Sequence, residues 1–137
     1  MKTGELQKLQ RTTSRTATSA KVWFEAESEL VKKAQFKTTG GLKDAGTGAV
    51  YVYFRNKNVE YVGETSRKVK ARMHDVTSPH KKAKWWPTWT HMRFLQISNR
   101  TDRLTLELLL VLGYLPKYNE KPGARSADEL FASYGKR

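Results

Sequence analysis

A single carboxylate stands inside the most apolar stretch of the chain. Glu107 is the only acid in the segment 104–112, which reads LTLELLLVL. A carboxylate with apolar neighbours on both sides is seldom there for packing, because burying an unpaired charge is costly. Helical geometry also allows Glu107 to face water, and that interpretation fits the pattern equally well. The sharper hypothesis is a metal site, since Mg²⁺ prefers carboxylate oxygen and keeps several waters, so one glutamate can suffice.

Two tyrosines, Tyr51 and Tyr61, stand in neighbouring segments that both read as strands. Residues 49–54 (AVYVYF) are rich in β-branched and aromatic side chains, a polar run follows, and residues 59–62 (VEYV) form a second such segment that ends at Gly63. This pattern predicts a β-hairpin that carries both tyrosines. Valines alternate with tyrosines in the first segment, so simple packing of a tyrosine on a sheet face is an open alternative.

The order of these residues resembles the GIY-YIG nucleases. The family's pattern has five pieces in a fixed order, namely two tyrosine half-motifs, an arginine on a helix, a glutamate and an asparagine. In this sequence they match Val50-Tyr51, Tyr61-Val62-Gly63, Arg72, Glu107 and Asn119. Each piece alone is common, but the five together, in order over about residues 48–119, are specific for the family.

The resemblance implies a DNA endonuclease that uses Mg²⁺ or Mn²⁺ to hydrolyse phosphodiester bonds. Glu107 would hold the metal, which polarises the phosphate and stabilises the leaving 3′ oxygen. Arg72 would face the scissile phosphate, and its planar guanidinium would donate hydrogen bonds to the non-bridging oxygens and stabilise their charge. Tyr51 and Tyr61 would line the site, one of them as general base or to orient water, although a phenol of ordinary pKa about 10 needs a cation nearby for that. Asn119 would order the site by hydrogen bonding.

Two departures from the family's pattern lie in or next to the tyrosine half-motifs. The first half-motif begins Ala49-Val50 rather than Gly-Ile, which is a mild change. Glu64 stands where some members carry a lysine, and an acid there repels DNA unless it binds metal or the arginine. Lys68 or Lys70 would then have to supply the missing positive charge next to the phosphate.

A third departure concerns histidine. Many members place a histidine four residues after the arginine, where this chain has Val76. His74 and His80 lie nearby, and either is a candidate for general base or leaving-group acid. An exposed histidine or a simple phosphate contact is the more ordinary interpretation for both.

A basic and aromatic segment follows the arginine. Its cations and rings are His80, Lys81, Lys82, Lys84, Trp85, Trp86 and Trp89. Lysines interleaved with tryptophans suit a nucleic-acid surface, because the cations meet phosphate and the rings stack on bases. The alternative is that two of the tryptophans close the core under a long loop.

The order of expected elements is α-β-β-α-β-α, which predicts an α+β fold with a small, mainly antiparallel three-stranded sheet flanked by helices. The expected ranges are a helix over 21–33 after Ser19, the hairpin, a short helix over 67–75, a strand over 92–97, a helix over 104–112 closed by Gly113, and a short helix over 127–134. Residues 1–18 are expected to form a flexible basic arm, and residues 19–137 one nuclease domain.

Charge points to a polyanionic partner. The 137 residues hold 26 Lys and Arg against 13 Asp and Glu, for a net charge of +13. Such a field attracts nucleic acid at long range. There is no cysteine, and no apolar run approaches the length of a membrane span. We expect a cytoplasmic protein that binds DNA and no membrane, as a monomer or a homodimer.

Two other interpretations stay open. Glu64 and Val76 favour a nucleic-acid-binding module on a catalytically degenerate nuclease scaffold. An RNA-binding factor would explain the charge and the tryptophans but not Glu107. As a nuclease, the small chain fits best with a phage or mobile-element enzyme that acts on foreign, host or competitor DNA, in a homing or restriction role.

Overall fold

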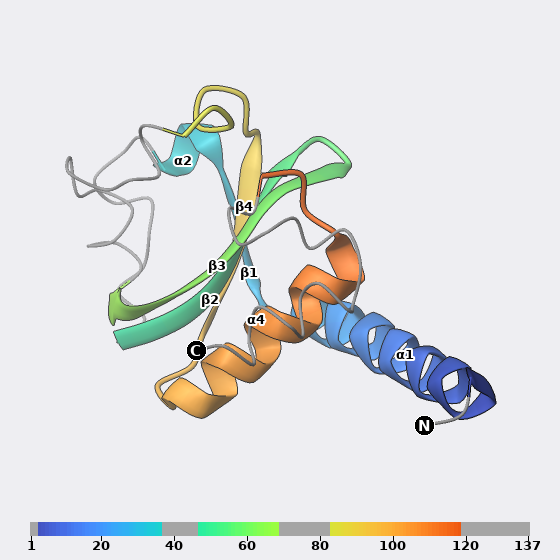
Figure 1. Ribbon diagram of the computed structural model, residues 1–137. Helices are drawn as coiled ribbons and strands as arrows, with labels where there is room; N and C mark the ends of the chain where they lie inside the picture. Colours follow the sequence, from blue (N-terminus) through green and yellow to red (C-terminus); the bar gives the residue numbers. More distant parts are fainter. Residues whose placement is uncertain (1–2, 37–46, 69–82, 119–137) are drawn as a thin grey trace.

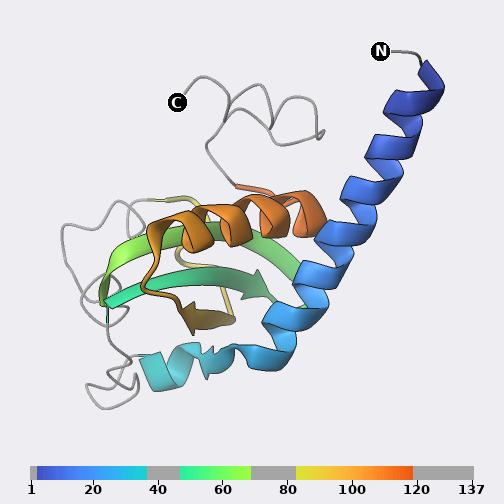
Figure 2. The same cartoon turned by 90° about the horizontal axis from the view of Figure 1, so that it is seen from below.

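A four-stranded antiparallel sheet forms the centre of the protein, and two helices, α1 and α4, cover one of its faces (Figures 1 and 2). The computed structural model describes residues 3–36, 47–68 and 83–118. The strand order is β1-β4-β2-β3, with bounds β1 Glu29–Lys32, β2 Thr47–Arg55, β3 Asn58–Lys68 and β4 His91–Gln96. The expected α+β class and the hairpin β2–β3 are confirmed, and the hairpin turns at Asn56 and Lys57.

The sheet has one strand more than the sequence predicts. The expected helix over residues 21–33 ends early, at Glu27, where the Ser28 amide donates to the Phe24 carbonyl at 2.8 Å. The chain then continues as β1, which places Val31 opposite Met92 of β4. Val31 is the one buried side chain of β1. Pairing with β4 and burial of this β-branched residue outweigh the helical pattern of the same segment.

Helix α1 (Thr3–Glu27) also begins far earlier than predicted. The expected flexible arm, residues 1–18, is helical from Thr3 onward, and Ser19 lies inside the helix. No glycine or proline interrupts the chain between Glu5 and Phe36, so nothing forces a break. The threonines on this half satisfy their hydroxyls on the helix itself, as Thr16 Oγ1 donates to the Thr12 carbonyl at 2.9 Å. Figure 2 shows this half of α1 extending past the sheet.

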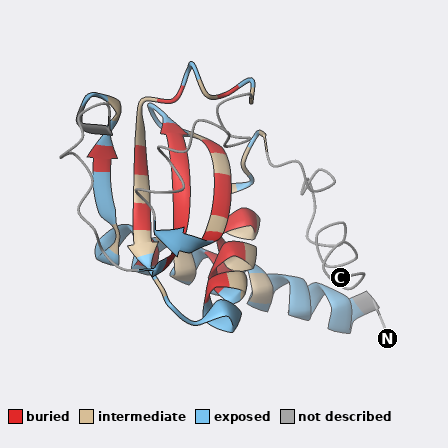
Figure 3. Ribbon diagram, turned by 90° about the vertical axis from the view of Figure 1, so that its left-hand side faces the viewer, coloured by how far each residue is buried: buried red, intermediate tan, exposed pale blue. Residues whose placement is uncertain are grey.

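The two faces of the sheet are packed differently. The face under α1 and α4 is aliphatic, and its buried members are Phe24, Val50, Val52, Phe54, Val62, Leu106, Leu110 and Val111. The opposite face is mainly aromatic, and its buried members are Val31, Ala49, Tyr51, Tyr53, Trp85, Trp89, Met92 and Phe94. The alternation of side chains along β2 separates these sets, and β2 is buried along almost its whole length (Figure 3). We call them the helix face and the aromatic face.

Helix α4 (Arg100–Tyr114) is longer than the expected 104–112. Asn99 caps it, because its side chain accepts from the Asp102 amide at 3.0 Å. The helix does not end at Gly113 but continues to Tyr114, and Leu115 caps it with φ of 50°. Gly113 instead lies where α1 crosses, since a Cβ there would come within 2.7 Å of the Lys21 side chain. Gly113, which was expected to end the helix, therefore allows α4 and α1 to pack closely.

Several expected elements fall partly or wholly outside the described residues. Of the expected short helix over 67–75, Arg67 and Lys68 belong to β3 and the rest is not described. The short helix over 127–134 lies outside as well. Helix α2 (Lys33–Phe36) follows β1 directly. Among the helices described, none is long and apolar enough to cross a membrane.

Candidate functional site

The two motif tyrosines lie together on the aromatic face. The hairpin register sets Tyr51 opposite Gly63 and Tyr53 opposite Tyr61, and the rings of Tyr51 and Tyr61 stack with centroids 6.3 Å apart. Their exposure differs. Tyr51 is 1% exposed, whereas Tyr61 is partly exposed and stacks on Trp85 at 5.2 Å. Tyr61 is therefore the motif phenol with access to a ligand, and Tyr51 supports it from within the core.

Glu107 lies in the other layer. It is 7% exposed on α4, and the same helix sends Leu106, Leu110 and Val111 into the core of the helix face. The tyrosines and Glu107 are thus on opposite sides of the sheet, next to its edge strand β3. A buried carboxylate on a helix that packs on β3 has the hard oxygen donors that Mg²⁺ or Mn²⁺ requires. In the parts of the chain described, no group of three or more acidic or histidine side chains gathers around a common point.

The segment after α4 connects these two layers. The Lys117 amide donates to the Val59 carbonyl at 3.2 Å, and the Tyr118 amide donates to the Glu60 carbonyl at 2.9 Å. These bonds run along the outer edge of β3. Tyr118 then packs against the aromatic face, next to the tyrosine cluster. The chain therefore passes from the helix layer around the edge of β3, and it reaches the tyrosine side immediately before position 119.

Glu64 has a structural partner. Its Oε2 accepts from Nε of Arg103 at 2.9 Å, and Nη1 of Arg103 donates to the carbonyls of Ile97 and Ser98 at 3.1 and 2.7 Å. Arg103 is 4% exposed. Register places Glu64 opposite Val50, on the helix face, so its carboxylate points away from the tyrosines. The acid that seemed to conflict with DNA binding is neutralised by a buried guanidinium.

The tryptophans divide between two roles. Trp85 and Trp89 are 3% and 1% exposed, and their rings pack on Tyr53 with centroids 4.7 and 5.0 Å away. The interpretation that two tryptophans close the core is confirmed. Trp85 belongs to the core of the aromatic face, and its predicted contact with nucleic acid stays a prediction. Trp86 is only partly buried and Lys84 is exposed, so these two stay candidates.

Most of the remaining predicted residues lie outside the described part of the chain. These are Arg72, Asn119, His74, His80, Lys70, Lys81 and Lys82. Lys68, at the end of β3, is described and exposed, opposite Thr47. The roles proposed for all of them stay predictions.

Arg103 is a buried charge next to the candidate site that the sequence analysis missed. It stands four residues before Glu107, so the same signal that singled out Glu107, a charge in an apolar helix, applies to it. A helical repeat places both on one side of α4, and both are buried there. No protein-family model, no curated protein and no solved structure matches this chain.

Proposed function

We propose that this protein is a metal-dependent endonuclease of the GIY-YIG type that cuts DNA phosphodiester bonds. The observation that supports it most is the stacking of Tyr51 on Tyr61 on the aromatic face. Glu107 is buried on α4, on the other face of the sheet, so the proposed site has to reach around the edge strand β3. Tyr51, Tyr61 and Glu107 follow one another along the chain in the order of the family pattern. The charge of +13 supplies the attraction for DNA.

The residues have separate tasks in this proposal. Tyr61, partly exposed, contacts the attacking water or the phosphate, and Tyr51 fixes its ring by stacking. Glu107 holds Mg²⁺ or Mn²⁺, and the metal supplies Lewis-acid polarisation of the phosphate. Arg72 and Asn119 complete the site by donating hydrogen bonds to the phosphate and to its neighbours. The partner is DNA of a phage or mobile element, its host or a competitor.

The test is conversion of supercoiled plasmid to nicked or linear forms in Mg²⁺. Glu107→Gln keeps the size of the side chain and removes the carboxylate, and we expect it to lower the cleavage rate at least about a hundredfold. Asp102→Asn is the matched control, because it removes one carboxylate from the exposed first turn of the same helix. Mg²⁺ should also raise the Tm of the wild type and not that of Glu107→Gln. Equal cleavage by both variants excludes Glu107 as the metal ligand.

A nucleic-acid-binding module on the same scaffold is the second candidate. The burial of Tyr51 favours it, because a phenol that is 1% exposed contacts no substrate in this state. This function predicts salt-dependent DNA binding with no cleavage in Mg²⁺ or Mn²⁺. The plasmid assay separates the two functions directly.

A further inference from the structure

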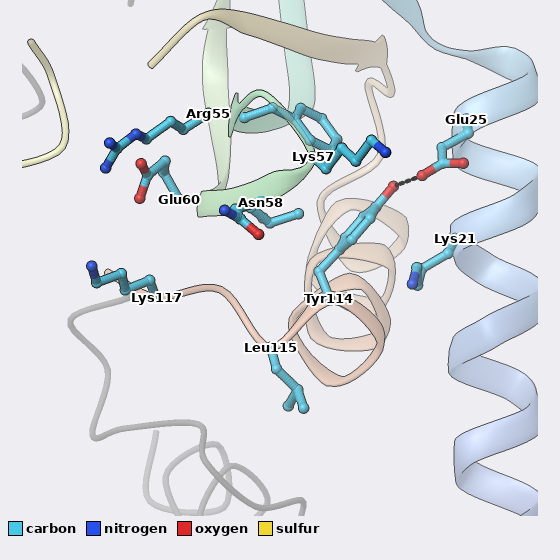
Figure 4. Close-up of a pocket in the computed structure, with 11 residues that line it drawn as sticks. Lys21, Glu25, Arg55, Lys57, Asn58, Glu60, Tyr114, Leu115 and Lys117 are labelled. Carbon is cyan, nitrogen blue, oxygen red and sulfur yellow. Dashed lines mark hydrogen bonds between the residues drawn. The ribbon is translucent and has the colours of Figure 1, made fainter. Parts of the chain in front are cut away.

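A polar pocket lies at the turn end of the hairpin, on the helix side of the molecule. It has a volume of about 490 Å³ and lies between α1, the hairpin turn and the end of α4. Figure 4 shows its charged side chains arriving from three separate elements, with Lys21 and Glu25 on α1, Arg55 and Lys57 at the turn, and Lys117 beyond α4. The pocket is distinct from the aromatic face that carries the tyrosines.

Positive charge dominates the pocket. Lys21, Arg55, Lys57 and Lys117 line it, against two carboxylates, Glu25 and Glu60. Within the described residues, none of these four cations has a carboxylate at ion-pair distance. Lys21 instead lies over the ring of Tyr114, with Nζ 4.9 Å from the centroid. Cations from separate elements that pair with no carboxylate of the described residues can together bind an anion with several charges.

One of the two carboxylates in the pocket already has a hydrogen-bond partner. Glu25 accepts a hydrogen bond of 2.6 Å from the hydroxyl of Tyr114, which holds it against the wall between α1 and α4 (Figure 4). Burial and this bond raise the pKa of Tyr114, so its hydroxyl stays a neutral donor. Glu60 is 3% exposed. The end of α4 adds about half a negative charge. The four positive side chains therefore outweigh the two carboxylates and the partial negative charge of the helix end.

The pocket adjoins the tyrosine side across the edge of β3. Glu60 lines the pocket, and the next residue, Tyr61, lies on the aromatic face. Lys117 likewise lines the pocket, its Nζ lies 5.1 Å from the ring centroid of Tyr118, and Tyr118 packs on the aromatic face. Two pairs of consecutive residues therefore connect the pocket with the aromatic face around the edge of β3.

We infer that this pocket binds the backbone phosphates of a nucleic acid next to the proposed cleavage site. This inference rests on the proposed function because it places the bound phosphates next to the proposed cleavage site, but it concerns binding and not cleavage. Lysine, arginine and asparagine side chains are the usual contacts to phosphate oxygens, and Asn58 stands among the cations here. A phosphate held in the pocket fixes the strand relative to Tyr61 without reading its sequence.

The experiment compares two double variants that each remove two positive charges. The pocket variant combines Lys57→Ala with Lys117→Ala and removes two exposed lysines from the pocket. The α1 variant combines Lys8→Ala with Arg11→Ala and removes two exposed cations from the half of α1 that extends past the sheet. Binding to a duplex oligonucleotide is measured in EDTA over a range of salt. The pocket variant should bind about tenfold more weakly, and the slope of log K against log salt should fall by roughly 1 for each lost phosphate contact. The α1 variant should change affinity less than about threefold.

Two results would overturn the inference. One is an equal loss in both double variants, which would mean that only the overall field matters. The other is saturable binding of inorganic phosphate or thymidine 5′-monophosphate that depends on Lys57 and Lys117 while duplex binding does not, which would assign the pocket to a free phosphate ester.

The inference and the proposed function fail separately. If the pocket variant binds DNA normally and Glu107→Gln abolishes cleavage, only the pocket assignment is wrong. If the wild type does not cleave plasmid in Mg²⁺ or Mn²⁺ but its DNA binding depends on Lys57 and Lys117, the endonuclease proposal is wrong and the phosphate site stands.

Discussion

The ring of Tyr51 occupies the space that a side chain at position 63 would need. A Cβ built on Gly63 would lie 2.6 Å from both Cζ and Oη of Tyr51. The two residues face each other across the β2–β3 pair, in the same register position on the aromatic face. The glycine of the second half-motif is therefore present for a physical reason, since it lets the tyrosine of the first half-motif lie flat against the neighbouring strand.

Gly63→Ala should destabilise the protein by about 2 kcal/mol, because the buried ring of Tyr51 has to move and overpacking of a core costs about that much. The free energy of unfolding in urea is the measurement. Plasmid cleavage should fall as well, since Tyr61 stacks on the displaced ring.

Gly4→Ala is the matched control. A Cβ at Gly4, in the first turns of α1, meets no atom within 4 Å, so this change should be neutral or stabilise by up to about 1 kcal/mol. An equal effect of the two substitutions would contradict the role assigned to Gly63.

Glu64→Lys, which introduces the cation that some GIY-YIG nucleases carry at the matching position, should destabilise this chain by about 3 kcal/mol. The new ammonium would face the buried guanidinium of Arg103, which also loses its carboxylate partner. Thermal unfolding followed by circular dichroism measures the loss.

Glu64→Gln separates charge from shape in this pair. The amide can still accept from Nε of Arg103, so we expect a smaller loss, about 1 kcal/mol. If Glu64→Lys unfolds at the wild-type temperature, the pair with Arg103 contributes nothing.

His91 should make stability depend on pH below neutrality. Burial, and then the charge of Arg93, lowers the pKa of His91 from its ordinary value of 6.5. The unfolded chain then binds a proton more readily than the folded one, so the stability from this group is present above pH 6.5 and falls as the solution is acidified through the lowered pKa. Urea unfolding at pH 7.5 and 5 measures the difference.

His91→Phe tests the source of that dependence. The ring of His91 stacks on Phe54 at 4.8 Å and an interplanar angle of 4°, and phenylalanine can keep this contact. The variant should lose less stability between pH 7.5 and 5 than the wild type. An unchanged loss would assign the effect to other groups.

Trp89 and Trp86 should respond differently to truncation. Trp89→Ala removes a ring that is 1% exposed and should cost about 4 kcal/mol, as large core deletions do. Trp86→Ala removes a partly buried ring and should cost less than about 2 kcal/mol, and it should weaken DNA binding if this ring stacks on a base. Urea unfolding and fluorescence titration with DNA measure the two effects, and equal losses of stability would contradict the division.

The sequence predicted the hairpin because valines and tyrosines alternate in it, and that period belongs to strands alone. It did not predict β1, because Leu30 to Lys33 fit a helix as well as a strand and only the edge of β4 decides between them. The partner of Glu64 could not be predicted either, because Arg103 lies thirty-nine residues further along the chain and the pair forms only when α4 packs on β3. Contacts between distant segments follow from packing, which local patterns do not encode.

The Lys117–Tyr118 segment has a consequence for assembly. Its two amides occupy the outward carbonyls of Val59 and Glu60, so the first part of the outer edge of β3 is already paired. The opposite edge of the sheet is β1, which has only four residues. Short or covered edges offer little backbone to a second molecule. A second copy could therefore add a strand at the start of β3 only by displacing the Lys117–Tyr118 segment.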